Sequence, residues 1–498
     1  MRRPRCLLSS AFAALLGALS SALLAAPAAG LLDASEVGLR DDLAWLADRR
    51  RIDLGTTTWP MPVSLVTAAL AAAKTQDMSE ADRDALARIR DALAKLDEAA
   101  VASWHINTAR QPVTDAGLAI RARNEASVQL QVASPSSAMR LRLGLQDERL
   151  AVSPSRAVID GSYIATQWHD TVVSLGAVDR WWGPARYASP ILGNAAPPIV
   201  TLGLRRSVES APETPLLAWV GPWNYELSVG RPGHYTPRGA NVIGIRLTAR
   251  PWPGVELGAS RYIYWGGVGR LNSFSSLRDA LLGHSNIDNP APMPDPSNEV
   301  AGIDLRWSLP TAKATWVAYG HFAGEDEANG MPSQWIATIG VQRKVADERR
   351  RIEWTAEASD TRLGHLFGLR PENLTPAYEH GTFVAGHYQH GLPVGAFIGG
   401  GGVVATLGVA VVPLSDATAP RWEARIWRAK VSELGNEPIN AAFGRPGTIN
   451  GLSLQAAGQA RPLRWHVGLA VQHRRGGAES GRRNIGLIGG MDLPLREP

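Results

Sequence analysis

The chain of 498 residues contains 51 Lys and Arg against 46 Asp and Glu, which gives a formal net charge of +5. Charged residues make up 19% of the sequence, below the roughly 25% that is usual in soluble domains. So small an excess of positive charge gives no support to nucleic-acid binding, and the low charge with 50 Gly and 17 Trp favours one large membrane barrel over several soluble domains.

The first residues have the three parts of a secretory signal peptide. Three arginines among the first five residues precede an apolar core at 7–24 and a small-residue cleavage zone at 25–29. We therefore expect residues 1–29 to be removed on export. The only cysteine, Cys6, lies in this segment, so the mature chain is expected to lack disulfides and thiolate chemistry.

A helical period follows, and it predicts a small periplasmic helical bundle over residues 30–104. Apolar residues recur every three or four positions in three short runs, with Ser35 and Ser79 as expected N-caps and Asp82 as the third residue of the last helix. A unit of about 70 residues builds only a marginal core, so we expect it to dock on the periplasmic end of a larger domain. It shows no metal-ligand or nucleophile spacing, which indicates a plug or docking module without chemistry of its own.

The remaining residues, 105–498, have the period of two that is typical of strands. In residues 243–250 aliphatic side chains alternate with polar or small ones, and the alternation resumes over residues 255–264 after a Pro-Trp-Pro-Gly turn. These two runs predict a hairpin. Similar runs total about 18, with a fair range of roughly 16 to 20, and the even number fits a closed all-β transmembrane barrel of antiparallel strands.

One hairpin cannot distinguish a soluble sandwich from a membrane barrel, because the two folds place the apolar face on opposite sides. The predicted inward rows are rich in charge, which would cost several kcal/mol per group in a soluble core but little in a wet lumen. The outward rows carry the tryptophans that an aromatic girdle requires. We therefore expect the aliphatic rows to face lipid. The inward charges are Arg140, Arg142, Arg246, Asp304, Arg306, Glu353, Glu357, Glu423, Arg425, Arg464 and His466, and the outward tryptophans are Trp307, Trp335, Trp354 and Trp465.

Residues 394–414 carry no charge and are long enough to cross a bilayer as a helix. The four consecutive glycines at 399–402 argue against this, because each costs roughly 1 kcal/mol relative to alanine in a helix. The segment instead predicts a glycine loop followed by a strand in which Val403 and Leu407 face lipid and Thr406 faces inward.

Three connections between the predicted strands are long, at residues 266–299, 361–382 and 434–450. The first includes a predicted serine-capped helix at 276–282, followed by a run rich in Pro, Asn and Asp. Long loops of outer-membrane barrels face outside and short turns face the periplasm. We therefore expect recognition to reside in these loops.

Residues 176–206, GAVDRWWGPARYASPILGNAAPPIVTLGLRR, resemble the signature of the capsule assembly family of the Wzi type. That signature reads roughly D-R-W-W-G-P, then a serine and isoleucine or leucine stretch, Asn, Ala, a proline and a run ending in arginine. Three further stretches agree in order: TTTWPMP at 56–62, RLTARPWPGVELGASR at 246–261 and AYEHGTFVAGHYQHG at 377–391. The resemblance therefore spans nearly the whole mature chain.

The resemblance implies an outer-membrane barrel of about 18 strands with a periplasmic helical bundle. It also implies a role in holding capsular or related exopolysaccharide at the cell surface, as a lectin-like anchor rather than an enzyme. The expected partners are polysaccharide and outer-membrane lipid, and we expect a monomer that binds neither nucleic acid nor a cofactor.

The candidate ligand-binding residues come from these stretches. Indole faces stack on the C–H surfaces of sugars, while Arg and Asp hydrogen-bond hydroxyl groups. The same side chains, with an ion pair inside the motif, would also lock a loop against the barrel wall, and the Gly-Pro turn beside two aromatic residues favours this structural interpretation. The candidates are Asp179, Arg180, Trp181, Trp182, Arg246, Tyr378 and His380.

Enzymatic interpretations have little support in the sequence. Glu379, His380, His387 and His390 form the densest group of potential metal ligands, but their spacing matches no established pattern, so no metal site is expected. The chain shows no nucleophile elbow, P-loop or dinucleotide fingerprint. A porin-like diffusion channel remains the main alternative to a polysaccharide-binding protein, with an outer-membrane hydrolase third.

Overall fold

The computed structural model describes most of the chain after the predicted signal peptide. Residues 1–28, including Cys6, and the loop residues 284–295 lie outside the described part. Among the described residues, no helix combines the length and the hydropathy that crossing a bilayer requires. The described residues are 29–97, 99–109, 121–150, 153, 155–283, 296–325, 327–328, 331–332, 334–364, 366–368, 375–414, 419–435, 437–476 and 483–495.

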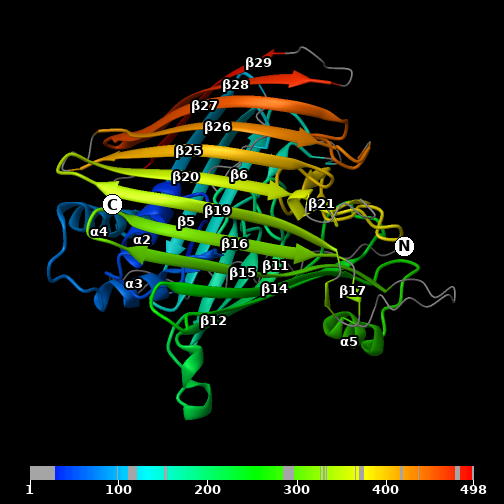
Figure 1. The fold of residues 1–498 in the computed structure, drawn as a ribbon, viewed down its shortest axis with the longest axis horizontal. Coiled ribbons are helices and arrows are strands. Elements are labelled where there is room, and N and C mark those ends of the chain that lie inside the picture. The colour runs from blue at the N-terminus through cyan, green and yellow to red at the C-terminus, as the bar shows by residue number, and fades with distance from the viewer. Residues whose placement is uncertain are drawn as a thin grey trace, which may run out of the picture.

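Eighteen antiparallel strands close into one barrel, which confirms the predicted fold class (Figure 1). Neighbours in the chain are neighbours in the sheet, and the last strand pairs with the first to close it. Strands β7 and β8 pair with successive parts of β6 and count as one interrupted strand. The barrel strands are β4 (Ala100–Asn107), β5 (Asn124–Ala133), β6 (Ser137–Gln146), β7 (Ala157–Val158), β8 (Tyr163–Trp168), β9 (Thr171–Gly176), β11 (Thr201–Arg206), β12 (Trp223–Gly230), β13 (Asn241–Ala249), β14 (Val255–Trp265), β15 (Ser297–Pro310), β16 (Thr315–Gly324), β19 (Trp335–Ala346), β20 (Arg350–Asp360), β25 (Val403–Pro413), β26 (Arg421–Val431), β27 (Gly447–Ala460), β28 (Leu463–Arg475) and β29 (Arg483–Pro494).

The predicted hairpin shows how the strands are oriented. Strands β13 and β14 pair antiparallel, with Leu247 opposite Ala259. Leu247 is 51% exposed, whereas its neighbour Arg246 is fully buried. The glycine loop and strand predicted at 394–414 also form, with Leu407 of β25 exposed and Thr406 buried. The aliphatic rows therefore face outward and the polar rows face the lumen, as the alternation predicted.

Strand β4 begins at Ala100, before the boundary at residue 105 that the sequence suggested. It follows the short helix η1 (Lys95–Asp97) almost directly, so the helical period runs nearly up to it and hides the change of period. Its outward row is short, with Trp104 and Ile106 exposed. The barrel therefore takes its first strand from residues that were assigned to the helical unit.

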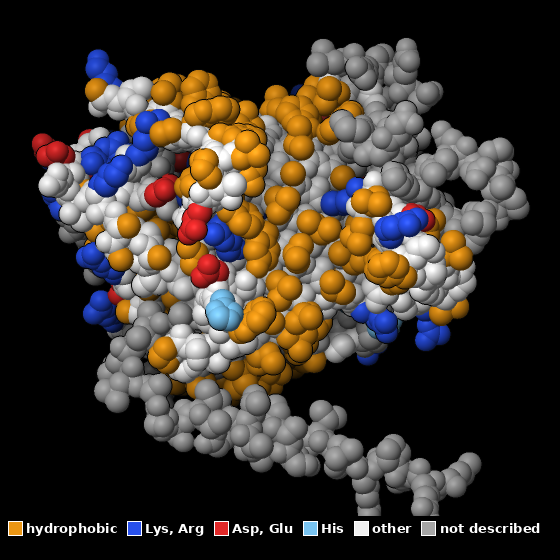
Figure 2. All heavy atoms as spheres, turned by 90° about the horizontal axis from the view of Figure 1, so that it is seen from below, with side chains coloured by type: hydrophobic (Ala, Val, Ile, Leu, Met, Phe, Trp, Pro, Cys, Tyr) orange, Lys and Arg blue, Asp and Glu red, His pale blue; other side chains and the backbone are white. Residues whose placement is uncertain are grey.

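The outer surface has the features of a lipid-facing wall. Figure 2 shows hydrophobic side chains spread over the strands, while most charged side chains gather towards the two ends. Exposed tryptophans lie near the end where short connections such as 311–314 and 347–349 join the strands, whereas Trp335 lies at the opposite end of β19. An apolar band with an aromatic belt is stable against lipid rather than water. The belt consists of Trp104, Trp168, Trp307, Trp316, Trp354 and Trp422.

The opposite end of the barrel carries the long connections (Figure 1). The helix predicted at 276–282 is α5 (Phe274–Leu282), which starts earlier because Ser273 is its N-cap. Three small hairpins form within the described parts of these loops. Their strands are β17 (Glu327–Ala328) with β18 (Met331–Pro332), β21 (Arg362–Leu363) with β22 (Thr375–Pro376), and β23 (Tyr388–Gln389) with β24 (Leu392–Pro393), and η3 spans Leu366–Gly368.

Three helices form at the N-terminal side of the barrel, as predicted: α2 (Val37–Asp48), α3 (Val63–Ala71) and α4 (Glu80–Ala94). Ser79 caps α4 in a capping box with Asp82, which confirms that prediction. The expected cap at Ser35 is wrong, because Glu36 holds the N-cap position of α2 and makes no side-chain cap bond. Short strands β1 (Leu31–Leu32) and β3 (Met61–Pro62) pair beside these helices.

Helix α2 is tied to the inside of the barrel by ion pairs. Asp48 contacts Arg306 of β15 at 2.5 Å and Lys344 of β19 at 2.9 Å. Burial alone would raise the pKa of Asp48, but these two cations lower it below its ordinary value. Asp42 contacts Arg351 of β20 at 2.7 Å. The helical unit therefore fills the mouth of the lumen at the end with the short turns, because the inward cations of the wall take their partners from it.

Replacing Asp48 with Ala leaves Arg306 and Lys344 buried with one carboxylate fewer. We expect the Asp48→Ala variant to lose about 3–5 kcal/mol of stability, since removing one partner of a buried ion pair leaves the desolvation energy of the other charge uncompensated. Chemical denaturation of the purified protein in detergent measures this loss. Asp53→Ala is the control, because Asp53 is 77% exposed in its pair with Arg250 and should contribute less than about 1 kcal/mol. Equal losses in the two variants would contradict the assignment.

Candidate functional site

The stretches that resemble the family signature meet inside the barrel. Strand β2 (Thr58–Trp59), from the TTTWPMP stretch, pairs antiparallel with β10 (Trp181–Trp182), from the DRWWGP stretch. Trp59 and Trp181 are opposite each other and share one apolar core with the helices. Two segments that lie far apart in the sequence therefore form one ladder within the lumen.

Arg246 joins the third stretch to this ladder. Its guanidinium makes a two-point contact with Asp304, at 2.6 and 3.1 Å. It also donates to Ser260 at 2.7 Å, and to the hydroxyl groups of Thr57 and Thr58 at 2.8 Å each. Because Arg246 is fully buried and its donors are directed at protein groups, its place in this structure is that of an internal brace.

Glu256, on the neighbouring strand β14, holds the same loop from the other side. Its carboxylate accepts hydrogen bonds from the backbone N–H of Thr56 at 2.9 Å and from that of Thr57 at 3.1 Å. The Thr57 hydroxyl donates to it at 2.6 Å. Sequence reasoning did not select Glu256, although its polar position in an alternating strand pointed inward.

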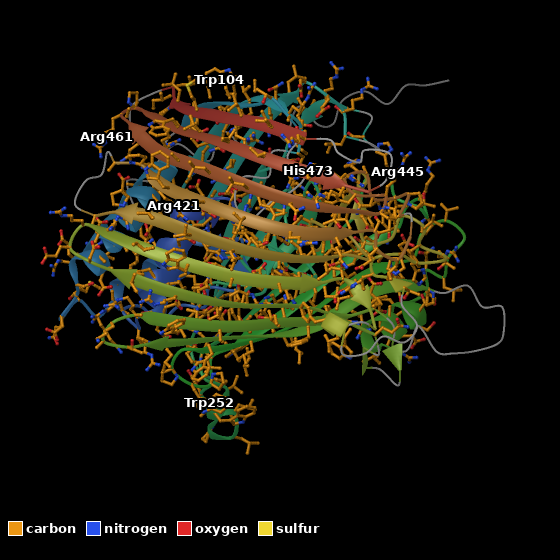
Figure 3. All side chains as sticks on the ribbon, turned by 45° about the horizontal axis from the view of Figure 1, so that its top comes forward. Trp104, Trp252, Arg421, Arg445, Arg461 and His473 are labelled. Atoms are coloured by element: carbon orange, nitrogen blue, oxygen red, sulfur yellow. The ribbon has the colours of Figure 1, made fainter. Side chains whose placement is uncertain are left out.

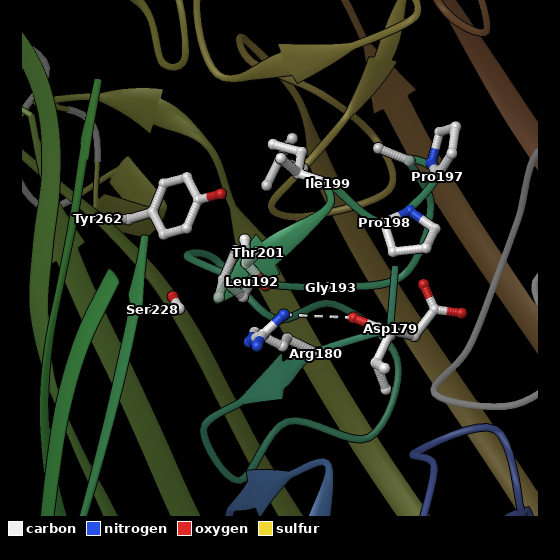
Figure 4. A pocket seen from close by; sticks show the side chains of 13 residues that line it. Asp179, Arg180, Leu192, Gly193, Pro197, Pro198, Ile199, Thr201, Ser228 and Tyr262 are labelled. Carbon is white, nitrogen blue, oxygen red and sulfur yellow. Dashed lines mark hydrogen bonds between the residues drawn. The ribbon is translucent and has the colours of Figure 1, made fainter. Parts of the chain in front are cut away.

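The ion pair expected inside the DRWWGP motif does not form, which corrects that interpretation. Asp179 contacts Arg121 at 2.6 Å, and Arg180 contacts Glu226 of β12 at 2.8 Å. Figure 4 shows the side chains of Asp179 and Arg180 pointing away from each other. Because the two side chains point away from each other, each finds a different partner. Burial raises the pKa of Asp179 to about 6, although Arg121 opposes this shift.

Both indoles of the motif are buried. The Trp181 ring lies 5.1 Å from the Arg40 guanidinium, and its N–H donates to the carbonyl oxygen of Ala185 at 3.0 Å. The Trp182 N–H donates to Glu226 at 3.1 Å, and the ring meets Tyr262 edge-on at 6.4 Å. Neither indole face is open to a sugar in this structure, and the two rings lie where the helical core meets the core beneath the outer loops.

The fourth stretch reaches the same interior from the outer loops. Tyr378 is buried, and its hydroxyl donates to the carbonyl oxygen of Pro190 at 2.7 Å. His387 lies 2.7 Å from the carbonyl oxygen of Ile191. Burial lowers the pKa of His387 to about 4, so its imidazole is neutral at neutral pH and donates to that oxygen. The segment at 377–391 is therefore fastened to the segment that follows DRWWGP.

His380 is the one predicted site residue that stays near the outer surface. Its ring accepts hydrogen bonds from the backbone N–H groups of Thr382 and Phe383, at 3.1 Å each. The ring also meets Phe383 edge-on at 5.5 Å. Among the described residues, no group of three or more His, Cys, Asp or Glu side chains is arranged to hold a metal ion.

Two of the cavities that the described residues enclose border this site. One of about 40 Å³ lies above Arg180, beside Thr201, Ser228 and Tyr262 (Figure 4), and it has room for water but not for a sugar ring. The other, of about 280 Å³, lies between the helical unit and strands β4–β6, and charged side chains line it. Asp179 borders both cavities, and its partner Arg121 borders the larger one.

A cluster of arginines lies at the end of the barrel that carries the long loops. Arg475 ends β28 and Arg483 begins β29, and Arg474 donates to the carbonyl oxygen of Arg445 at 2.7 Å. Within the described part of the chain, Arg445, Arg475 and Arg483 form no ion pair, and all three are exposed. Figure 3 shows Arg445 and His473 at this end, opposite Arg461. Sequence reasoning missed the cluster because its members come from three separate segments.

The Trp182 side chain is expected to stabilise the fold, because it is fully buried and bonded to Glu226. Trp182→Ala should destabilise the protein by about 3–5 kcal/mol, measured as a shift in the denaturation midpoint in detergent. Trp168→Ala is the matched control, since Trp168 is 66% exposed, and it should shift the midpoint much less. A stable Trp182→Ala protein that no longer binds polysaccharide would instead favour direct contact with the ligand.

The raised pKa of Glu437, which lies beneath the outer loops, predicts that the stability of the fold depends on pH. Burial, with Glu379 nearby, raises the pKa of Glu437 from 4.5 to about 8. Because the folded pKa lies above the unfolded one, this group stabilises the fold at low pH, and the contribution is lost as the pH rises towards the folded pKa. We expect the melting temperature to fall between about pH 5 and about pH 9, and to fall less in Glu437→Gln. Glu348→Gln, in an exposed turn, should leave the dependence unchanged, and an unaltered pH profile in Glu437→Gln would refute the prediction.

Comparison with known proteins agrees with this architecture. The family model described as capsule assembly protein Wzi matches residues 104–462. A Klebsiella pneumoniae protein, described as an uncharacterized 55.8 kDa protein in the cps region, is 34% identical over 467 residues, which cover 92% of this chain and 88% of that protein. A solved structure described as Escherichia coli Wzi, a carbohydrate-binding β-barrel of the outer membrane involved in group 1 capsule assembly, is 29% identical.

That structure superposes on 94% of this chain and 100% of its own, with a TM-score of 0.82. The closed barrel, its apolar outer band and this likeness confirm the predicted location in the bacterial outer membrane. Because the family model covers most of the chain and the signature stretches form its interior, the protein belongs to the capsule assembly protein Wzi family.

Proposed function

We propose that this protein binds capsular or related exopolysaccharide at the outer face of the outer membrane and retains it at the cell surface without catalysing a reaction on it. The observation that carries the proposal is the likeness over almost the whole chain to a barrel described as carbohydrate-binding and involved in capsule assembly. The protein acts as a monomer surrounded by lipid, and it binds no nucleic acid.

The orientation follows from the two unlike ends of the barrel. Short turns of outer-membrane barrels face the periplasm and long loops face outside. The helical unit touches the short-turn end, where Arg50 donates to the carbonyl oxygen of Pro253 and Lys95 donates to Gln459 at 3.0 Å. The helices are therefore periplasmic, and the arginine cluster with the loop of His380 faces the polysaccharide.

The arginine cluster suits an acidic polysaccharide. Exposed guanidinium groups bind sugar carboxylates through paired, charge-assisted hydrogen bonds. No ion pair engages Arg445, Arg475 or Arg483 within the described residues, and although the Arg475 Nε–H donates to His473 at 3.4 Å, the other guanidinium N–H groups of the three side chains can make such contacts. The buried candidates Asp179, Arg180, Trp181, Trp182, Arg246 and Tyr378 then position the loops instead of contacting the polymer.

A diffusion channel has less support. The helical unit, the DRWWGP segment and the 377–391 segment all pack within the wall. The cavity of about 280 Å³ lies between the helical unit and strands β4–β6. Nothing in this arrangement specifically favours a pore over a binding protein.

Replacing Arg445, Arg475 and Arg483 together with Ala tests the proposed contact. We expect binding of an acidic capsular polysaccharide to weaken about tenfold at low salt, because three exposed charge contacts of roughly 0.5 kcal/mol each sum to about 1.5 kcal/mol. Arg461→Ala is the matched control, since Arg461 is 84% exposed at the other end of the barrel. Glycan-array binding by the detergent-purified proteins measures the change, and equal binding by all three proteins would exclude this cluster as the contact surface.

A further inference from the structure

One connection at the short-turn end is unlike its neighbours. Strands β11 and β12 are joined by residues 207–222, here called the side arm, whereas residues 250–254 or 461–462 suffice for other pairs. The arm contains the 3-10 helix η2 (Pro215–Val220) and leaves the barrel wall below β12 (Figure 1). The length of the side arm, at an end of the barrel where other connections are short, needs a physical explanation.

The far part of the side arm is apolar and uncovered. Residues 214–223, TPLLAWVGPW, carry no charge, and no residue of η2 is buried. Leu216 is 82% exposed and Trp219 is 70% exposed. Trp252, in the neighbouring turn, is 63% exposed. Apolar side chains this exposed, gathered at one place, mark an interaction surface.

The base of the side arm is held firmly. Glu209 accepts a hydrogen bond from the backbone N–H of Gly55 at 2.9 Å and pairs with Arg250 at 2.7 Å. Arg206 lies 4.3 Å from the Trp223 ring and donates to the Trp223 carbonyl oxygen at 2.7 Å. Gly221, with φ +69°, lets the chain turn back where a Cβ atom would collide with the Arg250 carbonyl group. The arm is thus a positioned element whose direction is fixed by its base.

The side arm leaves the barrel wall at the level of the aromatic belt. Trp223 and Tyr225 follow the arm on β12, and their rings lie 6.1 Å apart. Figures 1 and 3 both show the arm extending away from the wall across the direction of the strands, with Trp252 beside its base in Figure 3. Because the strands cross the membrane, a segment directed across them runs along the membrane plane.

We propose that the side arm inserts Leu216 and Trp219 into the phospholipid of the inner leaflet of the outer membrane. Uncharged segments that carry Leu and Trp bury these side chains at the boundary between headgroups and acyl chains. The arm is continuous with the belt that already occupies this level, which favours lipid over a protein partner. The inference rests on the proposed orientation, with the helical unit on the periplasmic side.

This arrangement anchors the barrel against a pull from outside. A polymer held by the outer loops pulls the protein outward, and the polar backbone groups of the arm would then have to leave the interface and enter the hydrocarbon core, where unpaired backbone groups are costly. The arm adds resistance at the leaflet that is farthest from the polymer.

The experiment uses the full chain carrying Leu216→Cys, labelled with an environment-sensitive fluorophore and reconstituted in vesicles of phosphatidylethanolamine and phosphatidylglycerol. Nitroxide-labelled phospholipid should quench the fluorophore, whereas iodide on both sides should not. Lys313→Cys, exposed in the 311–314 turn at the same end, is the control and should show the reverse. Quenching of Leu216→Cys by iodide alone, or protection from both quenchers, would overturn the proposal, the second result because it indicates a covering protein.

A second measurement separates this inference from the proposed function. The double variant Leu216→Glu with Trp219→Glu changes only exposed side chains, so it should keep the binding of acidic polysaccharide in detergent. A fluorophore placed in this variant at Leu217→Cys should lose protection from iodide, relative to Leu217→Cys alone. Unchanged protection would overturn lipid insertion. If the unaltered protein did not bind acidic polysaccharide, the proposed function would be overturned. The quenching result would still decide whether the arm inserts into lipid.

Discussion

The inward-facing charges of the barrel wall need partners, and the chain supplies them from its own interior segments. Asp48 of α2 pairs with cations of β15 and β19, and the Thr57 loop pairs with Arg246 and Glu256. A buried charge without a partner is costly, so wall and plug depend on each other. Where the described parts of wall and plug meet, their charges are consequently matched.

The signature stretches share one structural role under this constraint, which is to hold the interior segments together. TTTWPMP, DRWWGP and the segment around Arg246 hold one another by a strand ladder and by buried hydrogen bonds. The fourth stretch fastens the outer loops to the same interior through Tyr378 and His387. The stretches that carry the family resemblance therefore describe how the barrel is filled.

The sequence predicted the elements whose cause is local, and it missed those whose cause is distant. Alternation alone identified the β13–β14 hairpin, and a capping box marked the start of α4. The predicted ion pair between Asp179 and Arg180 was wrong, because the partners of both side chains lie on other segments of the chain. The burial of Trp181 depends on Trp59, and the arginine cluster on two strand ends and a loop, which no periodicity reveals.

Closure of the barrel by β29 against β4 has a consequence for assembly. The helices precede β4 in the chain and reach the periplasm first, yet the cations that neutralise α2 come from β15, β19 and β20. Contacts between residues so far apart in sequence form late. The acidic face of α2 must therefore stay hydrated until most of the wall exists, which makes docking of the plug a terminal event in the maturation of the protein.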